Sequence, residues 1–254
     1  MLSLPDPHHQ LQLFFNDIIR KLNPRDYFWD YKNNTPIPYI VFDNFLPAEL
    51  FELVSTDHNN IPDYFWNEFT RNGSYMKECK SLIHAPMLNT LSYCFNSGVF
   101  IDWLERLTDQ KKLIPDPHLI GAGMSKTVTG NSLKLHTDFN WNDELALNRS
   151  LSLIFYTNPT WDESWGGGLE FWNFEKTNII QSTLPRPNRL LIWNYDHRLI
   201  HGYPAPLNCP TDQARINMRI FYYQSNSVPH DQPHRSLYWW DNNSMKPLDN
   251  RTQK

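Results

Sequence analysis

The stretch "RINMRIFYY", residues 215–223, alternates polar and apolar residues over its first six positions. Successive side chains of a β-strand point to opposite faces of the sheet. As a strand, this segment would place its isoleucines and methionine on one face and Arg215, Asn217 and Arg219 on the other. It is the last of several short strand-like runs, and together these runs decide the fold class.

Short runs rich in β-branched and aromatic residues follow Pro115, and turn residues separate them. They are "HLIGAGM" (118–124), "SLKLHTD" (132–138), "RSLSLIFYT" (149–157), "GLEFWNF" (168–174), "TNIIQST" (177–183), "NRLLIWN" (188–194), "RLIHGY" (198–203) and the final "RINMRIFYY". Strands at such close spacing favour an antiparallel sandwich or barrel.

The residues before this region show a different pattern of apolar residues, one typical of helices. Residues 9–23, "HQLQLFFNDIIRKLN", have apolar residues at helical spacing and stop before Pro24. Residues 38–55 predict a strand followed by a helix that starts near Pro47, and residues 85–109 predict one or two helices. We therefore expect an α+β fold whose N-terminal helices pack on one sheet of a β core. Residues 1–254 would form a single domain, with a helical part over about 1–112, the core over about 113–225 and a C-terminal extension over 226–254.

The composition of the chain argues against nucleic-acid-binding, secreted and membrane-spanning proteins. The chain has 254 residues, 40% of them hydrophobic, and a formal net charge of −4, so it can bury a core and lacks the basic character of nucleic-acid-binding proteins. Its three cysteines have no metal-site spacing and favour a reducing, cytoplasmic setting. Its first ten residues do not resemble a signal peptide, and no apolar run is long enough to span a membrane. The sequence gives no indication of oligomeric state.

The run "SLKLHTD" places His136 and Asp138 two residues apart, hence on the same face of a strand. An imidazole and a carboxylate so placed can reach one metal ion, although a polar strand face is more often simply solvated. A second histidine would complete a site. His197 and His201 are the candidates, and we favour His201 because His197 follows Asp196 in an apparent turn.

Arg215 could bind the carboxylate of a molecule held at such a metal site. Two histidines and one carboxylate on one side of an iron ion leave three coordination positions open. A 2-oxo acid and O₂ can fill these positions, and the far carboxylate of the acid needs a planar cationic partner such as arginine. The alternative is that Arg215 is a surface charge on an edge strand.

The order of the segments "HTD", "YTNPTWDESWGGGLEFW", "NRLLIWNYDHRLIHGYPAP" and "ARINMRIFYY" resembles the iron(II)- and 2-oxoglutarate-dependent oxygenases of the prolyl 4-hydroxylase type. The resemblance covers about residues 116–225. It implies a double-stranded β-helix, or jelly roll, and it implies Fe(II), 2-oxoglutarate and O₂ as cofactor and cosubstrates, with ascorbate as a further option.

Carried over by position, the resemblance makes His136, Asp138 and His201 the iron ligands. Arg215 and Tyr156 would bind the distal carboxylate of 2-oxoglutarate, although a tyrosine in such a run is more often a core aromatic. Four further residues could contact the substrate or the side chains that hold the iron ligands in place: Arg219, Lys126, Asn140 and Trp141.

Two positions depart from the family pattern. Arg219 stands where a small or hydroxyl-bearing residue is usual, and Lys126 stands where a tyrosine often lines the cosubstrate pocket. For Arg219 three partners are open: an internal carboxylate such as Glu170, the 2-oxoglutarate, or an acidic group on the substrate.

The function implied is a dioxygenase that hydroxylates an unactivated C–H bond. We favour a small-molecule substrate, such as an amino acid, a natural-product intermediate or a sugar derivative, over a peptidyl, prolyl-type side chain. A zinc hydrolase would use the same ligands but needs no dicarboxylate clamp, and a non-catalytic jelly roll that binds a metal or a ligand is the alternative of another class.

Overall fold

The computed structural model describes residues 6–225 and 236–238, so the C-terminal extension expected over 226–254 lies almost wholly outside the described residues. The helices are α1 (Pro7–Asn16), α2 (Ile18–Lys21), α3 (Pro24–Lys32), α4 (Ala48–Asp57), α5 (Pro86–Phe95) and α6 (Gly98–Thr108), with short 3₁₀ turns η1 (His58–Asn60), η2 (Asp63–Phe65) and η3 (Glu163–Trp165). None of the helices in this part of the chain is long and apolar enough to cross a membrane.

The strands are β1 (Tyr39–Phe42), β2 (Asn67–Arg71), β3 (Ser74–Cys79), β4 (Ile114–Pro115), β5 (Gly123–Val128), β6 (Leu133–Thr137), β7 (Trp141–Asn142), β8 (Leu147–Tyr156), β9 (Leu169–Trp172), β10 (Ile179–Thr183), β11 (Leu190–Asn194), β12 (His201–Tyr203), β13 (Ala214–Gln224) and β14 (Leu237–Tyr238). They form two antiparallel sheets. The larger has the order β1-β11-β8-β13-β5-β3-β2, with β4 paired to β13 and β7 to β8, and the smaller has the order β10-β9-β12-β6-β14.

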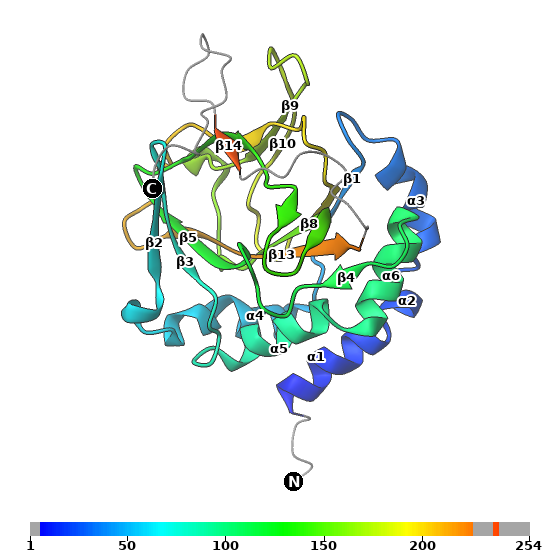
Figure 1. Cartoon of the computed structure of the whole chain (residues 1–254). Helices are drawn as coiled ribbons and strands as arrows, with labels where there is room; N and C mark the ends of the chain where they lie inside the picture. The colour runs from blue at the N-terminus through cyan, green and yellow to red at the C-terminus, as the bar shows by residue number, and fades with distance from the viewer. Residues whose placement is uncertain (1–5, 226–235, 239–254) are drawn as a thin grey trace.

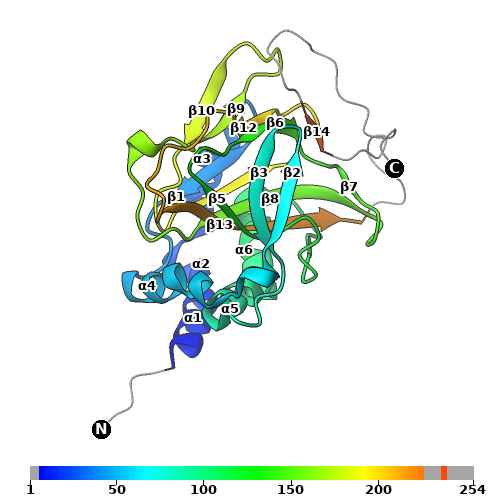
Figure 2. The same ribbon diagram turned by 90° about the vertical axis from the view of Figure 1, so that its left-hand side faces the viewer.

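The helices cover one face of the larger sheet, as Figures 1 and 2 show. Apolar side chains of α1, α5 and α6 pack there against the alternate residues Ile216, Met218 and Ile220 of β13 in one continuous core. The opposite face of the same sheet looks toward the smaller sheet, and Ile154 and Phe171 belong to the core between the two sheets. The expected α+β architecture, with N-terminal helices on one sheet of a double-sheet core, is confirmed.

Several elements differ from the expectation. The strand expected over 118–124 begins only at Gly123, because Asp116 accepts backbone hydrogen bonds from His118 and Ile120 and holds a turn there. Helix α3 was not expected, because Pro24 also suits the first turn of a new helix. The strand expected before the helix near Pro47 is β1, which joins one edge of the larger sheet, whereas the hairpin β2–β3 at the other edge was not expected.

Candidate metal centre and cosubstrate pocket

Strands β6 and β12 bring three metal-binding side chains together. They are antiparallel neighbours in the smaller sheet, and His201 lies directly opposite His136 in their register. Asp138 follows β6 and is two residues from His136, so the three side chains converge. Their ligand atoms all lie within 4.8 Å of one another. His201 Nε2 is 3.5 Å and His136 Nε2 is 3.9 Å from the Asp138 carboxylate.

The protonation states of the two histidines and the aspartate allow this cluster to bind a cation. His136 Nδ1 donates to the Lys134 carbonyl at 2.9 Å, which leaves Nε2 to face Asp138. Burial, reinforced by the nearby His201, lowers the pKa of His136 to about 3, and burial lowers the pKa of His201. For Asp138, burial opposes ionisation, but neighbouring positive charge, that of Arg149 above all, outweighs it and lowers the pKa of this carboxyl. Two neutral imidazoles and one carboxylate are the donors that an iron(II) site requires.

His197 lies apart from this cluster. Its side chain is 50% exposed and its Nδ1 is 3.9 Å from Asp196, which in turn binds Arg198. Asp196 also accepts the backbone N–H of Arg198, as expected for a turn. The structure therefore brings His201, and not His197, to His136 and Asp138.

Arg149 is a member of the site that sequence reasoning missed. Its Nη2 donates to Asp138 Oδ2 at 2.8 Å, and the guanidinium lies 3.5 Å from the ring centroid of Phe221. Its Nε and Nη2 also donate to Ser152. The only sequence signal was a charged residue at the start of a long apolar strand, where burial would have to be explained.

A second polar cluster lies on the inward face of the larger sheet, between β8 and β13. Arg215 is buried, its Nε donates to the Gly167 carbonyl at 2.9 Å and its Nη2 donates to the Tyr156 hydroxyl at 3.1 Å. The guanidinium also lies over the ring of Tyr203, and Tyr203 shares a hydrogen bond with Thr127. None of the carboxylates in residues 6–225 and 236–238 forms an ion pair with Arg215, so a buried positive charge lacks an anion there.

The loop that meets Arg215 requires glycine. Gly167 has a φ of +73°, and a Cβ at this position would approach Leu207 to 2.6 Å and Arg215 Cδ to 3.3 Å. Any side chain would therefore strain this loop, collide with Leu207 and press on the aliphatic part of Arg215. Tyr156, for its part, keeps its proton because burial raises its pKa. Since it accepts from Arg215, its own O–H remains to donate to an anion bound beside that guanidinium.

Of the three partners open to Arg219, the structure shows an internal carboxylate, but this carboxylate is Glu78 and not Glu170. Arg219 forms an ion pair with Glu78 of β3, whereas Glu170 accepts a hydrogen bond from the indole of Trp172 at 3.0 Å. Because Glu78 balances its charge, Arg219 no longer requires an acidic group on a substrate.

Lys126 lies outside the site. It stands opposite Ile216 in the β5–β13 register, on the helix-covered face, and the neighbouring Thr127 faces inward. The one-residue difference reverses the direction of the side chain, so the expected pocket role of Lys126 is wrong. Asn140 and Trp141 follow Asp138: Asn140 is buried and accepts the Arg149 backbone N–H, and Trp141 is half-buried on β7.

The C-terminal strand β14 lies against the metal-ligand strand. Tyr238 stands opposite His136 in the register of β14 and β6. Its ring stacks on the His136 ring, with centroids 4.9 Å apart and an interplanar angle of 16°. One wall of the candidate metal centre thus comes from residues 236–238.

Comparisons with known proteins agree with this geometry. Residues 122–223 match the family model of the 2OG-Fe(II) oxygenase superfamily. No curated protein matches the chain in sequence. A Trichoplax adhaerens prolyl hydroxylase, solved in complex with a hypoxia inducible factor peptide fragment, has 16% identity and a TM-score of 0.55 over 85% of this chain and 91% of that one.

Two further solved structures are similar. A Pseudomonas putida prolyl-4-hydroxylase has 13% identity and a TM-score of 0.54, covering 84% of this chain and 100% of that one. HygX from Streptomyces hygroscopicus, solved with nickel, 2-oxoglutarate and hygromycin B, has 11% identity and a TM-score of 0.52, covering 78% of this chain and 86% of that one. At such identities the likeness establishes the fold, a double-stranded β-helix. The matched residues 122–223 lie within this fold, and this part of the chain is similar to the 2OG-Fe(II) oxygenase superfamily.

Proposed function

We propose that the chain is an iron(II)- and 2-oxoglutarate-dependent dioxygenase that hydroxylates an unactivated C–H bond, with His136, Asp138 and His201 as iron ligands. The observation that carries the proposal is the placement of two incomplete sites on the inward faces of the sheets. One is a cluster of two neutral imidazoles and a carboxylate within 4.8 Å. The other is a buried arginine, Arg215, that lacks a carboxylate among the described residues.

Each residue of the second cluster has a part in holding the cosubstrate. Arg215 would pair with the distal carboxylate of 2-oxoglutarate, because a guanidinium binds a carboxylate through two parallel hydrogen bonds. The Tyr156 hydroxyl would donate a further hydrogen bond to the same carboxylate. Gly167 and Tyr203 keep the guanidinium in place through a carbonyl acceptor and an aromatic face.

The residues around the metal ligands orient the ligands and exclude water. Lys134 fixes the imidazole of His136, and the Tyr238 ring covers one side of it. Arg149 holds Asp138 ionised by its charge. An iron(II) ion with bound 2-oxoglutarate supplies oxidation by O₂, with release of succinate and CO₂.

The substrate class rests on two kinds of relatives. Hygromycin B, bound to HygX, supports a small-molecule substrate, and the peptide bound to the Trichoplax prolyl hydroxylase supports the peptidyl alternative. We favour a small molecule. We also propose a cytoplasmic location, which the three buried, unpaired cysteines support; fractionation of cells that express the chain would test it.

The deciding experiment incubates the full chain anaerobically with Fe(II) and 2-oxoglutarate, then admits O₂ and follows succinate. A dioxygenase releases succinate slowly without substrate and faster with one. A zinc hydrolase or a non-catalytic jelly roll releases none. The absence of any Fe(II)- and O₂-dependent succinate would overturn the proposal.

A further inference from the structure

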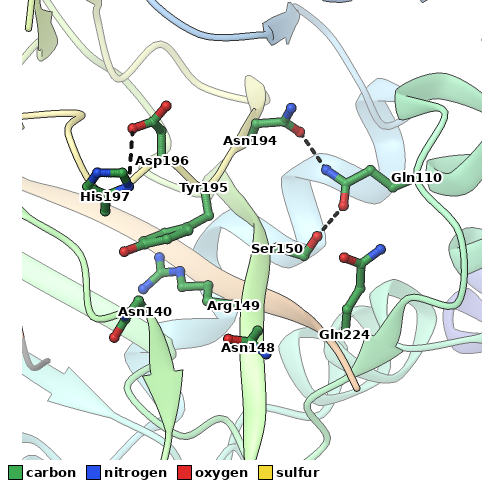
Figure 3. A pocket seen from close by; sticks show the side chains of 10 residues that line it. All are labelled: Gln110, Asn140, Asn148, Arg149, Ser150, Asn194, Tyr195, Asp196, His197 and Gln224. Atoms are coloured by element: carbon green, nitrogen blue, oxygen red, sulfur yellow. Dashed lines mark hydrogen bonds and ion pairs between the residues drawn. The ribbon is translucent and has the colours of Figure 1, made fainter. Parts of the chain in front are cut away.

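A pocket of about 370 Å³ lies beside the candidate metal centre, at the ends of β8, β11 and β13 and next to the loop after α6 (Figure 3). Arg149 lines this pocket, and its Nη2 is 2.8 Å from Asp138 Oδ2. The pocket therefore adjoins the metal ligands on the side away from Arg215, which lies toward the opposite end of β8 beside Tyr156. Its volume falls within the usual range of small-molecule sites, roughly 300–1,000 Å³.

The formal charges at the pocket are balanced within the protein. Arg149 pairs with Asp138, and Asp196 binds Arg198 through two hydrogen bonds of 2.7 and 3.0 Å. Because the guanidinium and carboxylate groups there already have counter-ions, neither charge needs a charged ligand, and Arg149 Nη1, which has no hydrogen-bond partner among the described residues, can donate to a neutral oxygen. The pocket favours a neutral ligand.

Carboxamides dominate the lining, and contacts between the side chains fix how some of them are turned. Gln110 Nε2 donates to Asn194 Oδ1 at 2.6 Å, and Tyr31 donates to the same oxygen. Ser150 donates to Gln110 Oε1, and Figure 3 shows this chain of contacts from Ser150 through Gln110 to Asn194. Asn194 Oδ1 thus accepts two hydrogen bonds, which leaves its Nδ2 as a donor at the pocket.

Gln224 and Tyr195 complete this lining. Gln224 Nε2 donates to the Lys111 carbonyl at 2.8 Å, which leaves Gln224 Oε1 as an acceptor. The Tyr195 ring lies on the opposite side of the pocket from Gln110, beside Arg149 (Figure 3). A hydroxyl group both donates and accepts, so several hydroxyls on one molecule would match alternating amide donors and acceptors, and a flat ring suits the C–H face of a sugar.

We infer that this pocket binds the substrate of the proposed dioxygenase and that the substrate is a neutral, polyhydroxylated small molecule, a saccharide or a cyclitol. That the bound molecule is a substrate rests on the proposed dioxygenase function. That the ligand is neutral and polyhydroxylated rests only on the residues that line the pocket.

The test measures binding before turnover. Isothermal titration of the metal-free full chain uses glucose, trehalose and myo-inositol as probes, with a Pro-containing tripeptide as the peptide probe. At least one polyol should bind and the tripeptide should not. Gln110→Met removes the amide at the centre of the network and should weaken polyol binding about tenfold, since one lost hydrogen bond is worth about one decade.

Gln181→Met is the matched control, because Gln181 lies on β10 at the edge of the smaller sheet and does not line the pocket. It should bind polyols as the unmodified chain does. Ser150→Ala removes a single hydrogen bond from the same network and should weaken polyol binding less. Cooperative thermal unfolding confirms that each variant folds. Binding of the tripeptide alone, binding of none of the probes, or equal polyol affinity in Gln110→Met and Gln181→Met would overturn the inference.

The two proposals fail separately. His136→Ala should retain polyol binding, because His136 does not line the pocket, and should lose metal binding. Polyol binding through Gln110 in a chain that releases no Fe(II)- and O₂-dependent succinate would refute the proposed function and leave the ligand class intact. A polyol that binds but never accelerates measurable succinate release would leave the dioxygenase intact and refute the inference that the pocket binds its substrate. Succinate release that only the tripeptide accelerates would leave the dioxygenase intact and refute the saccharide pocket.

Discussion

The two faces of β13 are almost equally buried, yet they contain opposite kinds of residues. On the helix-covered face Met218 is 0% exposed and packs among apolar side chains. On the inward face Arg215 is 2% exposed and meets a tyrosine hydroxyl, a carbonyl and an aromatic ring. Burial alone therefore does not distinguish a core position from a site position. The difference lies in the partners, because a buried charge persists only where hydrogen bonds and an anion compensate it.

The largest expected effect concerns the metal ligands on the inward side of the smaller sheet. His136→Ala and His201→Ala should each weaken Fe(II) binding more than about a hundredfold, which exceeds the usual cost of losing an outer-shell partner. His197→Ala should change it little, because that side chain is half exposed and lies apart from the cluster. Anaerobic calorimetric titration with Fe(II) measures all three. If His197→Ala abolishes binding while His201→Ala does not, the distal ligand is misassigned.

Substitutions of Arg215 and Met218 should separate the two faces of β13 most clearly, because one should affect cosubstrate binding and the other stability. Arg215→Leu would leave the carboxylate of 2-oxoglutarate without its partner, at a cost of about 3–5 kcal/mol, so the affinity for 2-oxoglutarate should fall at least about a hundredfold. Tyr156→Phe should cost about 1 kcal/mol. Met218→Ala should instead lower the free energy of unfolding by about 2–5 kcal/mol and leave 2-oxoglutarate binding unchanged. Equal 2-oxoglutarate affinity in Arg215→Leu and the unmodified chain would refute the clamp.

Arg219 tests whether an inward-facing charge can be purely structural. It and Glu78 are 18% and 23% exposed, so Arg219→Met should cost only about 1–2 kcal/mol of unfolding free energy. Half-saturation by 2-oxoglutarate and the KM of the substrate should both stay unchanged. A raised half-saturation would make Arg219 a second clamp, and a raised substrate KM alone would show that it binds an acidic group of the substrate.

The smallest effect is a pH dependence of stability. The unfolded chain protonates its histidines near pH 6.5, whereas burial lowers the pKa of folded His136 to about 3 and also lowers that of His201. The stabilisation is therefore complete above pH 6.5 and is lost as the pH falls toward 3. Between pH 7 and 6 the metal-free chain should lose about 0.7 kcal/mol through His136, and the lowered pKa of His201 adds to this loss. Urea unfolding at both pH values measures the loss. His136→Ala should show a smaller loss than the unmodified chain does, by about 0.7 kcal/mol.

Much of the fold follows from local pattern. Strict alternation predicted β13 and its two faces, and helical spacing predicted α4, α5 and α6. The hairpin β2–β3 was missed because "NEFTR" and "SYMKEC" lack a clear alternation of apolar residues. The turn at 118–122 was missed because its apolar residues resemble a strand, while the cause of the turn is the side chain of Asp116.

The site was predictable where its residues lie close along the chain or in a recurrent order. His136 and Asp138 are two residues apart. The local sequence favoured His201 over His197, the position of Arg215 on the last strand suggested its role, and the resemblance supplied Tyr156. Pairings across strands were not predictable: Glu78 is 141 residues from Arg219. Lys126 was assigned to the wrong face because its register with Ile216 is a property of the sheet and not of the local sequence.

The stacking of Tyr238 on His136 has a consequence for the order in which the protein is made. His136, Asp138 and His201 all leave the ribosome before Ser236, where the described part of the C-terminal region begins. At roughly 5–20 residues per second, a few seconds of synthesis separate the last ligand from the strand that covers the first. A nascent chain thus holds a complete set of ligands before one wall of the centre exists. Iron that arrives in that interval meets a centre that is open on one side, whereas iron that arrives later meets a centre in which the Tyr238 ring already covers the face of His136.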